Sequence, residues 1–552
     1  MKERMPFAMP IVGGLVLLAL VLFVLPDSLF SGFGINRHAG GVSESERVAG
    51  SIKTEDETGS GLATFDPLAA QWAALMARLG SKNARPNETL LSFDSAEAMK
   101  AFLDRADEAG LKILGKIDAL NMVRVGYDDL NDLRDDMRAH PGDYAGAGPN
   151  YLVQIPTVPS LENRPEQREV GFDDGALAFM GVKGDISTWG KGVTIAILDT
   201  GVTAHPAFTN GRVTSIDIGM GLTGTSDADG HGTAVASLAG GGMTGAAGVA
   251  PAANLLSIRV TDSDGVSDLF TLAQGIQTAV DAGAKVINIS LGAYNDSSVL
   301  SRMIDYADRH GSIIVAAAGN DQSSTMTWPA ANPLVISVGA VDAVGQQVSF
   351  SNSGENLSAT APGLGLNAAW PGGQIVSFDG TSGSAPLMSG AIASMLSLNP
   401  KLTARQAASL VTTYSADAGA PGPDPRYGNG TVDIGYALNF GNTAYLDPSI
   451  SSQYFHPDEN SMEFVVQNRS GSGVSSLTLD INAAGVSQSI AVPFLQAGER
   501  WSYTVPIDQA RLTTETQLQY SSRLRLPAGL TDVNPGNNGK MSVVFKPTVA
   551  AP

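Results

Sequence analysis

The arrangement of apolar and polar residues changes character several times along the chain. From about residue 171 to residue 440, apolar runs alternate with helical patterns and glycine-rich turns. Strands buried on both faces of a parallel sheet are apolar along their whole length, so this alternation predicts an α/β fold with helices on both faces of a parallel sheet. The predicted strands are Val193–Leu198, Leu255–Val260, Val286–Ser290 and Ile313–Ala318, and the predicted helices are Leu269–Ala282 and Val299–His310.

The segment before this α/β unit follows a different pattern. Residues 85–156 predict the order strand, helix, strand, strand, helix, strand, which is that of a ferredoxin-like α+β fold. The predicted elements are Glu88–Phe93, Ser95–Gly110, two strand-like runs within Leu111–Val125, Leu130–Ala139 and Tyr151–Pro156.

The segment after Asn442 changes pattern again. Short alternating strands separated by turn residues predict an all-β sandwich of about 100 residues. The predicted strands are Ser461–Gln467, Ser476–Ile481, Ser487–Val492 and Met541–Phe545.

An apolar segment lies near the start of the chain. Residues 7–25 are uncharged and mostly apolar, and they follow Lys2 and Arg4. This length is close to the roughly 20 residues that a helix needs to cross a bilayer, and the basic flank predicts a cytoplasmic N-terminus with the rest exported. The alternative is a cleaved signal peptide, whose apolar region is usually about 7–15 residues long and ends at a small-x-small site such as Gly32–Gly34. Both interpretations predict export.

These patterns together predict the domain organisation. Glycine, serine and charged residues predominate from about Gly34 to Thr64, which predicts a flexible spacer, and Asp66–Gly80 predicts a short amphipathic helix. The predicted boundaries are 1–33 for the cytoplasmic tip with the anchor or signal segment, 34–84 for the spacer with its helix, 85–156 for the ferredoxin-like unit, 157–170 for a linker, 171–440 for the α/β unit and 441–552 for the sandwich.

Length, charge and cysteine content exclude several classes of protein. A chain of 552 residues exceeds the roughly 250–300 residues of a single core, in agreement with several folded units. The net charge of −20 excludes an electrostatic grip on phosphates, so no nucleic-acid partner is predicted. The chain has no cysteine, which rules out disulfides, thiolate catalysis and cysteine-ligated metals.

Three glycine-rich loops of the α/β unit contain polar residues that can act together. Asp199 follows a predicted strand, and His231 and Ser382 each lie at the start of an apolar helix. An imidazole can take a hydroxyl proton, a carboxylate can hold the imidazole in the required tautomer, and a helix start offers N–H groups to a developing oxyanion. Each residue alone also has a structural explanation, as a turn, core or helix-capping residue. Their conjunction in the order Asp, His, Ser predicts nucleophilic catalysis by the serine.

The three motifs resemble those of subtilisin-family serine endopeptidases (subtilases) over about residues 171–440. The resemblance implies that Asp199 orients the base, His231 is the general base and then acid, and Ser382 is the nucleophile of an acyl-enzyme mechanism. The apolar run that ends at Asn320 resembles the segment whose asparagine completes the oxyanion hole, which implies that role for Asn320. The predicted function is therefore hydrolysis of peptide bonds in extended protein or peptide substrates, with no cofactor assigned.

The resemblance also implies a substrate-binding cleft. One strand end pairs with the substrate backbone, and a second segment lies on the opposite side of the extended peptide. The pocket for the residue before the scissile bond (P1) is expected to be modest in size and uncharged. The residues implied in these contacts are Ser290, Leu291, Gly292, Gly265, Ala317 and Thr327.

The sequence departs from the family pattern at several positions. Gly383 and Ser384 follow the serine, where the family usually has a larger residue and then alanine, and Leu387 stands where histidine is frequent. The segment between His231 and Gly248 is too short, and too poor in Asp and Asn, for the calcium loop of many relatives. Calcium is possible but is not assigned, and no metal site is predicted. The loop acids that could be oxygen ligands, or simply solvated, are Asp227, Asp229, Asp262 and Asp264.

The same resemblance implies functions for the two flanking units. The ferredoxin-like unit resembles an inhibitory propeptide, whose last strand would occupy the substrate channel and which would be cut off somewhere within Pro156–Gly171. The C-terminal unit is similar to immunoglobulin-like adhesion modules of exported bacterial proteins. The predicted partners are thus protein substrates, the chain's own propeptide and a membrane bound through the N-terminal helix. The alternative is an exported peptide-binding or adhesion protein with a catalytically silent protease-like unit.

Overall fold

The computed structural model describes residues 67–159, 169–209, 211–218, 230–295 and 297–545. The apolar segment at residues 7–25 and the spacer-like residues 34–64 lie outside these ranges. None of the helices within the described ranges is both long and apolar enough to cross a membrane. The short helix predicted at Asp66–Gly80 is present as α2 (Pro67–Leu79).

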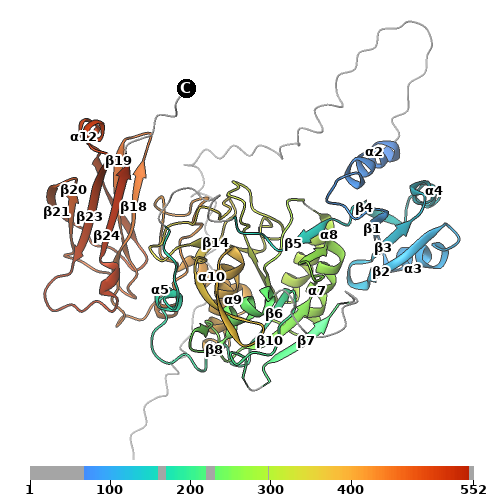
Figure 1. The fold of residues 1–552 in the computed structure, drawn as a ribbon, viewed down its shortest axis with the longest axis horizontal. Helices are drawn as coiled ribbons and strands as arrows, with labels where there is room; N and C mark the ends of the chain where they lie inside the picture. The colour runs from blue at the N-terminus through green and yellow to red at the C-terminus, as the bar shows by residue number, and fades with distance from the viewer. Residues whose placement is uncertain (1–66, 160–168, 210, 219–229, 296, 546–552) are drawn as a thin grey trace, which may run out of the picture. The chain divides into compact units, whose positions relative to one another are not determined.

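A seven-stranded sheet forms the middle of the α/β unit (Figure 1). Its strand order is β15-β14-β13-β12-β6-β10-β7, and all neighbouring strands are parallel. All four strands predicted from apolar runs belong to this sheet, so the predicted α/β fold is confirmed. The strands are β6 (Thr194–Asp199), β7 (Val213–Asp217), β10 (Asn254–Arg259), β12 (Val286–Ile289), β13 (Ile313–Ala317), β14 (Ile336–Val341) and β15 (Ala359–Pro362).

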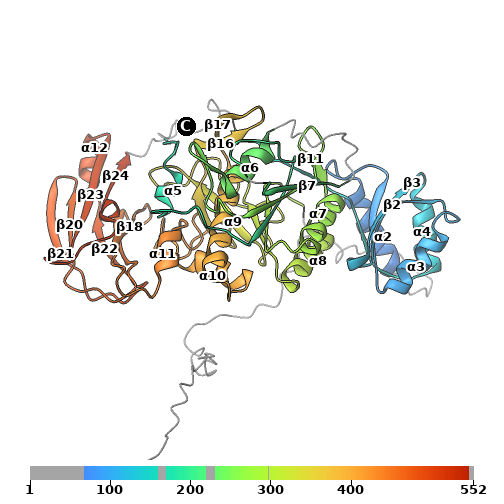
Figure 2. The same ribbon diagram turned by 90° about the horizontal axis from the view of Figure 1, so that it is seen from below.

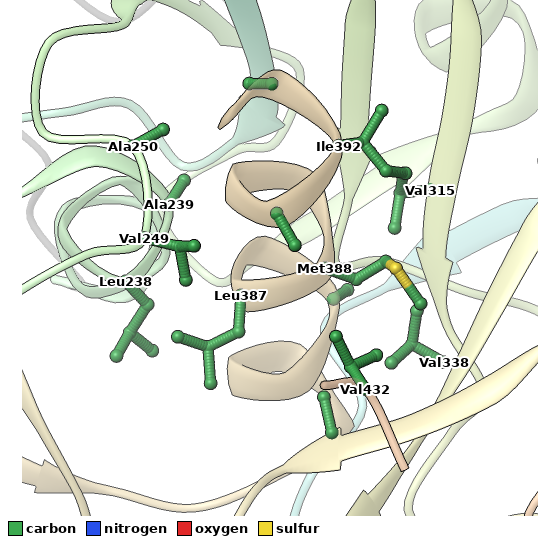
Figure 3. Packing of buried hydrophobic residues seen from close by; sticks show 14 of the residues in the cluster. Leu238, Ala239, Val249, Ala250, Val315, Val338, Leu387, Met388, Ile392 and Val432 are labelled. Carbon is green, nitrogen blue, oxygen red and sulfur yellow. The ribbon is translucent and has the colours of Figure 1, made fainter. Parts of the chain in front are cut away.

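Helix α9 (Thr381–Leu398) lies in the apolar core on one face of this sheet. Sixteen of its 18 residues are buried. Its Met388 and Ile392 point toward the strands, while Leu387 points toward helix α6 (His231–Gly240) (Figure 3). The two helices approach closely because α9 has glycine at Gly390, where a Cβ would lie only 2.6 Å from a backbone oxygen of α6. The nucleophile candidate thus lies in the first turn of a rigidly packed helix.

Helices α7 (Leu269–Asp281) and α8 (Ser298–Arg309) lie side by side on the other face of the sheet (Figure 2). Both were predicted from their periodic apolar residues. Successive residues of a strand point to opposite faces, so the central strands supply apolar side chains to both cores. The remaining elements of this unit are α5 (Ala176–Phe179), β8 (Gly242–Met243), β9 (Ala246–Ala247), β11 (Val266–Asp268), β16 (Leu366–Trp370), β17 (Gln374–Phe378), α10 (Ala404–Thr413) and α11 (Ile434–Asn439).

The ferredoxin-like unit has the predicted element order and the sheet order β2-β3-β1-β4. The prediction of its last strand was wrong, because β4 (Tyr144–Gly148) completes the sheet instead of Tyr151–Pro156. The glycine- and alanine-rich β4 has few of the residues that favour strands, which explains why the pattern missed it. The segment predicted as that strand contains β5 (Leu152–Gln154), which pairs with β11 of the α/β unit. The other elements are β1 (Glu88–Phe93), α3 (Ala96–Arg105), β2 (Leu111–Ile117), β3 (Met122–Tyr127) and α4 (Leu130–Ala139).

The C-terminal unit consists of a three-stranded sheet, β18-β19-β22, and a four-stranded sheet, β21-β20-β23-β24. Apolar residues from both sheets share one core, as expected of the predicted sandwich. The pattern missed β18 because its buried positions include Ser449, Ser451 and Ser452. The elements are β18 (Pro448–His456), β19 (Ser461–Asn468), β20 (Thr478–Ala483), β21 (Val486–Ala491), β22 (Arg500–Pro506), α12 (Gln509–Thr514), β23 (Gln517–Arg525) and β24 (Gly539–Phe545).

The burial of α9 leads to a stability prediction. Ile392 is fully buried, so Ile392→Ala is expected to lower the free energy of unfolding by about 2–5 kcal/mol through lost burial and the cavity left behind. Leu398→Ala is the matched control, because Leu398 lies on the same helix but is 44% exposed. Urea denaturation in a Ser382→Ala background measures both changes. Equal effects of the two substitutions would contradict the assignment of α9 as the centre of the core.

Candidate active site

The three predicted residues each lie at the start or end of an element of the α/β unit. Asp199 is the last residue of β6, His231 is the first of α6, and Ser382 is the second of α9. All three are buried. The ring of Phe378 connects the last two: its centroid is 5.4 Å from that of His231, and it also lies against the position next to Ser382 in α9.

The carboxylate and the imidazole form a direct contact. Asp199 Oδ1 is 2.8 Å from His231 Nδ1. Since a carboxylate can only accept, Nδ1 bears the proton of this hydrogen bond, and Nε2 of the neutral ring is left as the proton acceptor. Thr200 fixes this pair from the side, because its N–H donates to Asp199 Oδ1 at 2.8 Å and its hydroxyl accepts from Gly232 N at 2.9 Å. The base is therefore held in one orientation.

The serine lies where a helix offers unpaired donors. Ser382 is in the first turn of α9, where backbone N–H groups and the positive end of the helix dipole favour a negative charge. Its carbonyl accepts from Ser290 Oγ at 3.2 Å. Within the described ranges, the buried Ser382 Oγ has no hydrogen-bond partner. The hydroxyl is therefore available to a reacting group.

Asn320 lies beside the start of the same helix. Its Oδ1 accepts from Thr381 N at 3.0 Å and from Thr381 Oγ1 at 2.9 Å. These two donors fix which side of the amide faces the helix, so the Nδ2 group faces the cleft. There it donates to the Pro156 carbonyl at 3.0 Å. Thr381 was not singled out from the sequence, although its position directly before the serine places it at this helix start.

The segment that follows the ferredoxin-like unit lies in the cleft as an extended strand. Strand β5 pairs antiparallel with β11, and Ile155 N donates to Gly265 O at 3.2 Å. On the other side, Gln154 and Gly292 exchange two hydrogen bonds of 3.1 and 2.9 Å. The chain's own segment therefore forms the backbone hydrogen bonds that were expected on both sides of an extended substrate peptide.

The same segment continues past the start of α9. Pro156 contacts Asn320 on one side, while Val158 packs on the other side against an apolar cluster. A Cβ added at Gly380, two residues before Ser382, would lie 3.2 Å from Val158. The peptide bond between Pro156 and Thr157 thus passes close to the turn that bears the serine. The cluster that holds Val158 consists of Ala340, Val348, Phe350 and Leu364.

The other predicted substrate-binding residues differ in whether their side chains or only their backbone atoms border the cleft. Gly292, Ala317 and Thr327 lie together: a Cβ at Gly292 would be 2.4 Å from Thr327 Oγ1, which itself donates to Ala317 O at 3.4 Å. Leu291 is fully buried among the core residues packed by α7 and α8, so its side chain faces the core. Its backbone, between Ser290 and Gly292, is what borders the cleft.

The candidate oxygen ligands do not assemble into a metal site within the described ranges. No group of three or more His, Cys, Asp or Glu side chains suitable for a metal occurs there. Asp262 Oδ1 instead accepts from the backbone N–H groups of Asp264 and Val266, which closes the turn before β11. Asp227 and Asp229 lie outside the described residues.

A buried carboxylate holds the ferredoxin-like unit on the α/β unit. Asp268, at the N-terminus of α7, accepts from Arg85 Nε at 2.7 Å and lies 3.6 Å from Arg124 Nη1. Arg124 also forms a bidentate pair with Glu88, with both distances 2.8 Å. Asn150 Oδ1 accepts from Phe270 N at 3.1 Å, one residue into the same helix turn. Sequence patterns gave no signal for the contacts of Asp268 and Asn150, because these join segments more than 100 residues apart.

Comparisons with known proteins agree with this geometry. The model of the subtilase family (peptidase S8) matches residues 190–430. The thermostable alkaline protease of Halalkalibacterium halodurans is 35% identical over 257 residues, which cover 45% of this chain and 68% of that protein. Subtilisin BL of Lederbergia lenta is 34% identical over 247 residues, which cover 44% of this chain and 90% of that protein.

A solved structure resembles a larger part of the chain. Fervidolysin of Fervidobacterium pennivorans, described as a keratinolytic enzyme related to subtilisin, superposes with a TM-score of 0.57. The match covers 85% of this chain and 77% of fervidolysin, at 21% sequence identity. At this identity the likeness concerns the fold.

Proposed function

The chain belongs to the subtilase family of serine endopeptidases, and we propose that Asp199, His231 and Ser382 form its catalytic triad with Asn320 as an oxyanion donor. The observation that carries this assignment is the 3.0 Å contact between Asn320 Nδ2 and the Pro156 carbonyl oxygen. A peptide carbonyl is thus held by the amide proposed to stabilise it, in a strand with substrate-like pairing. The chain's activity is hydrolysis of peptide bonds.

The proposed reaction gives each of these groups one role. Ser382 Oγ attacks the substrate carbonyl carbon while His231 Nε2 takes the hydroxyl proton, and Asp199 stabilises the resulting imidazolium through Nδ1–H. Asn320 Nδ2 and the N–H groups at the start of α9 donate to the oxyanion. The C–N bond then breaks as His231 gives the proton to the leaving amine, which leaves an acyl-enzyme on Ser382. Water then attacks the acyl-enzyme while His231 takes its proton, and the carboxylic acid product is released as Ser382 regains a proton.

The chain's own segment supports an assignment of the substrate contacts. We infer that a substrate residue at the position of Gln154 pairs with Gly292 on one side and with β11 on the other, next to Gly265. The pocket for the P1 side chain is then bounded by Gly292, Ala317 and Thr327. The Thr327 side chain lies against Gly292 and shortens this pocket. These residues bring no charge into it.

We infer that residues 85–156 act as an inhibitory propeptide of the peptidase unit at 171–440. Two contacts support this: β5 occupies the substrate strand, and Asp268 binds two arginines of the ferredoxin-like unit. The bond proposed for self-processing is Pro156–Thr157, at the start of the predicted linker 157–170. The C-terminal unit at 441–552 is proposed as an immunoglobulin-like sandwich.

The residue before the proposed bond is unfavourable for rapid cleavage. In an antiparallel ladder in which Gln154 faces Gly292, residue 156 faces Ser290 and would donate its N–H to that strand. Proline has no N–H, so Pro156 cannot make this bond. We therefore propose that the precursor processes itself slowly. This slow step would keep the exported enzyme latent.

We propose export of the chain, with residues 7–25 as a membrane anchor or a cleaved signal peptide. The support is the length and charge pattern of this segment, which lies outside the described residues. Anchor, spacer and propeptide all precede the peptidase unit in the chain. Cleavage at Pro156–Thr157 would therefore sever the covalent connection between the peptidase and the bilayer.

The oxyanion assignment gives the first functional prediction. Asn320→Ala is expected to lower kcat/KM by roughly 10²–10³-fold, because one hydrogen bond to the oxyanion is lost while the triad remains. Ser382→Ala should lose far more. Hydrolysis of a chromogenic peptide, after a trace of wild-type enzyme has removed the propeptide, measures both. Asn399→Ala, at the exposed far end of α9, is the matched control and should keep full activity. Near-normal hydrolysis by Asn320→Ala would overturn the assignment.

The proposed processing site gives the second functional prediction. Purified precursor should acquire a new N-terminus at Thr157, and Pro156→Ala should process several-fold faster because residue 156 regains its N–H. N-terminal sequencing over a time course checks both the site and the rate. Pro159→Ala leaves residue 156 without an N–H and should process at the wild-type rate. A new N-terminus elsewhere between residues 160 and 171 would refute the proposed bond.

The proposed release from the membrane gives the third functional prediction. Wild-type cells should yield a soluble form of about 40 kDa, in proportion to the 57.0 kDa of the full chain, while Ser382→Ala stays full-length in the membrane fraction. Ser409→Ala, at an exposed position of α10, is the matched serine control and should still be released. A Ser382→Ala protein found in the soluble fraction would identify residues 7–25 as a cleaved signal peptide. Active wild-type enzyme that stays full-length and membrane-bound would rule out release by self-processing.

A further inference from the structure

The contact between the peptidase unit and the sandwich contains buried charges. Arg469, directly after β19 of the sandwich, donates through Nη1 to Asp433 Oδ2 at 2.9 Å. The same guanidinium lies 3.5 Å from Asp447 Oδ2. Arg469, Asp433 and Asp447 are all at most 5% exposed. Asp433 of the peptidase unit therefore forms a buried charge cluster with Asp447 and Arg469, which follow it in the chain.

Asp433 belongs structurally to the peptidase unit. It caps α11, where its Oδ1 accepts from Tyr436 N at 2.9 Å. A Cβ at Gly181 would lie 2.2 Å from the same oxygen, so the peptidase unit encloses this carboxylate on its inner side. Burial raises the pKa of Asp433, and Arg469 opposes that effect. Arg469 is the charged group of the sandwich that compensates this carboxylate.

A second buried carboxylate of the peptidase unit repeats the arrangement. Asp417 is 1% exposed, and its Oδ1 lies 3.2 Å from Arg500 Nε of β22. Its backbone N–H donates to Gln467 Oε1 of β19 at 3.2 Å. Two residues further on, Gly419 O accepts from Ser452 Oγ of β18 at 2.6 Å. Three strands of the sandwich thus contact one segment of the peptidase unit.

The residues just before Asp433 also support the helix that bears the nucleophile. The N–H of Thr360 in β15 donates to Gly430 O at 2.9 Å, and the Thr360 carbonyl accepts from Val432 N at 2.8 Å. The carbonyls of Ala361 and Pro362 in the same strand accept from Ser384 Oγ at 3.1 and 3.0 Å. The buried charges therefore lie on a continuous set of contacts that ends two residues from Ser382.

We propose that the sandwich is a fixed structural part of the peptidase, held by Arg469 and Arg500 against the buried carboxylates Asp433 and Asp417. A separately tethered adhesion module would need a long exposed linker and a surface that tolerates separation. Here α11 and β18 are joined by residues 440–447 alone, and Asp447 of that segment is itself part of the charge cluster. Removal of one partner would leave a buried charge uncompensated, which disfavours the docked arrangement far more than loss of an exposed pair.

The test uses the full chain with Ser382→Ala, so that self-cleavage does not interfere and the result is independent of the catalytic assignment. Arg469→Met should lower the melting temperature by roughly 5–10 °C. It should also make the bonds after the half-buried Tyr445 and Leu446 susceptible to added chymotrypsin, which releases the sandwich. Arg525→Met is the matched control, because its ion pair with Asp480 is exposed, and it should shift melting by about 1 °C or less.

A compensating change makes the test specific for the charge pair. Asp433→Asn/Asp447→Asn/Arg469→Met removes all three charges of the cluster and should recover at least half of the lost melting temperature and the protection of the linker. If Arg469→Met does not fold, Asp433→Asn/Asp447→Asn and the triple variant still report whether the arginine and the carboxylates are coupled. In the active background, either variant should keep kcat/KM at 25 °C within about twofold but lose activity faster on heating.

Three results would overturn the proposal. One is an Arg469→Met protein that melts like Arg525→Met and keeps its linker protected. The second is a triple variant that is no more stable than Arg469→Met, because the arginine would then not act through the two carboxylates. The third is a wild-type protein that is cut after Tyr445 or Leu446 as readily as in an exposed loop.

Discussion

The packing of α9 is the constraint on which the rest of the structure depends. Its later turns fill the core between α6 and the sheet, while its first turn presents Ser382 and open N–H groups at the cleft. A helix that is buried almost throughout cannot shift without opening the core, so the serine is held at a fixed position relative to the strands. The small residues of α9 follow from this requirement, since Gly390 has no room for a side chain. Catalytic geometry and stability are therefore determined by the same helix.

The position of the chain's own strand in the cleft follows from this rigidity. Its backbone meets Gly292 on one side and β11 on the other, and its Pro156 carbonyl meets Asn320. A preformed cleft binds any extended segment through backbone bonds, so the proposed inhibition by the precursor would need only a segment with poor reactivity. The missing N–H of Pro156 would supply that property. Substrate recognition and latency can then share one set of contacts.

Sequence patterns were sufficient where a local signal exists. The buried parallel strands are recognisable as apolar runs. Asp199 and His231 lie in distinctive glycine-rich loops, and in the structure their side chains are 2.8 Å apart. Patterns failed where the determinant is a distant partner. Leu152–Gln154 has a strand pattern, but nothing in it says that the partner is β11 instead of the ferredoxin-like sheet. The serines of β18 and the ion pair of Arg469 with Asp433 likewise give no sequence signal, because their burial depends on a surface formed by other segments of the chain.

The two flanking units are bound to the peptidase by ion pairs, of which the Arg469–Asp433 pair at the sandwich is the most deeply buried. At the ferredoxin-like unit, Asp268 is buried, but the side chains of Arg85 and Arg124 keep 30% and 20% of their surface in solvent. Water therefore solvates these cations before and after separation, and screening keeps these ion pairs weak, which suits a unit proposed to be released. At the sandwich, the side chains of Arg469 and Asp433 are each only 6% exposed. Either charge alone would be unfavourable in that position, so the pair enforces one docked arrangement. The Arg469–Asp433 pair thus distinguishes the part proposed to be retained from the part proposed to be released. The second arginine at the sandwich, Arg500, is 31% exposed, like Arg85.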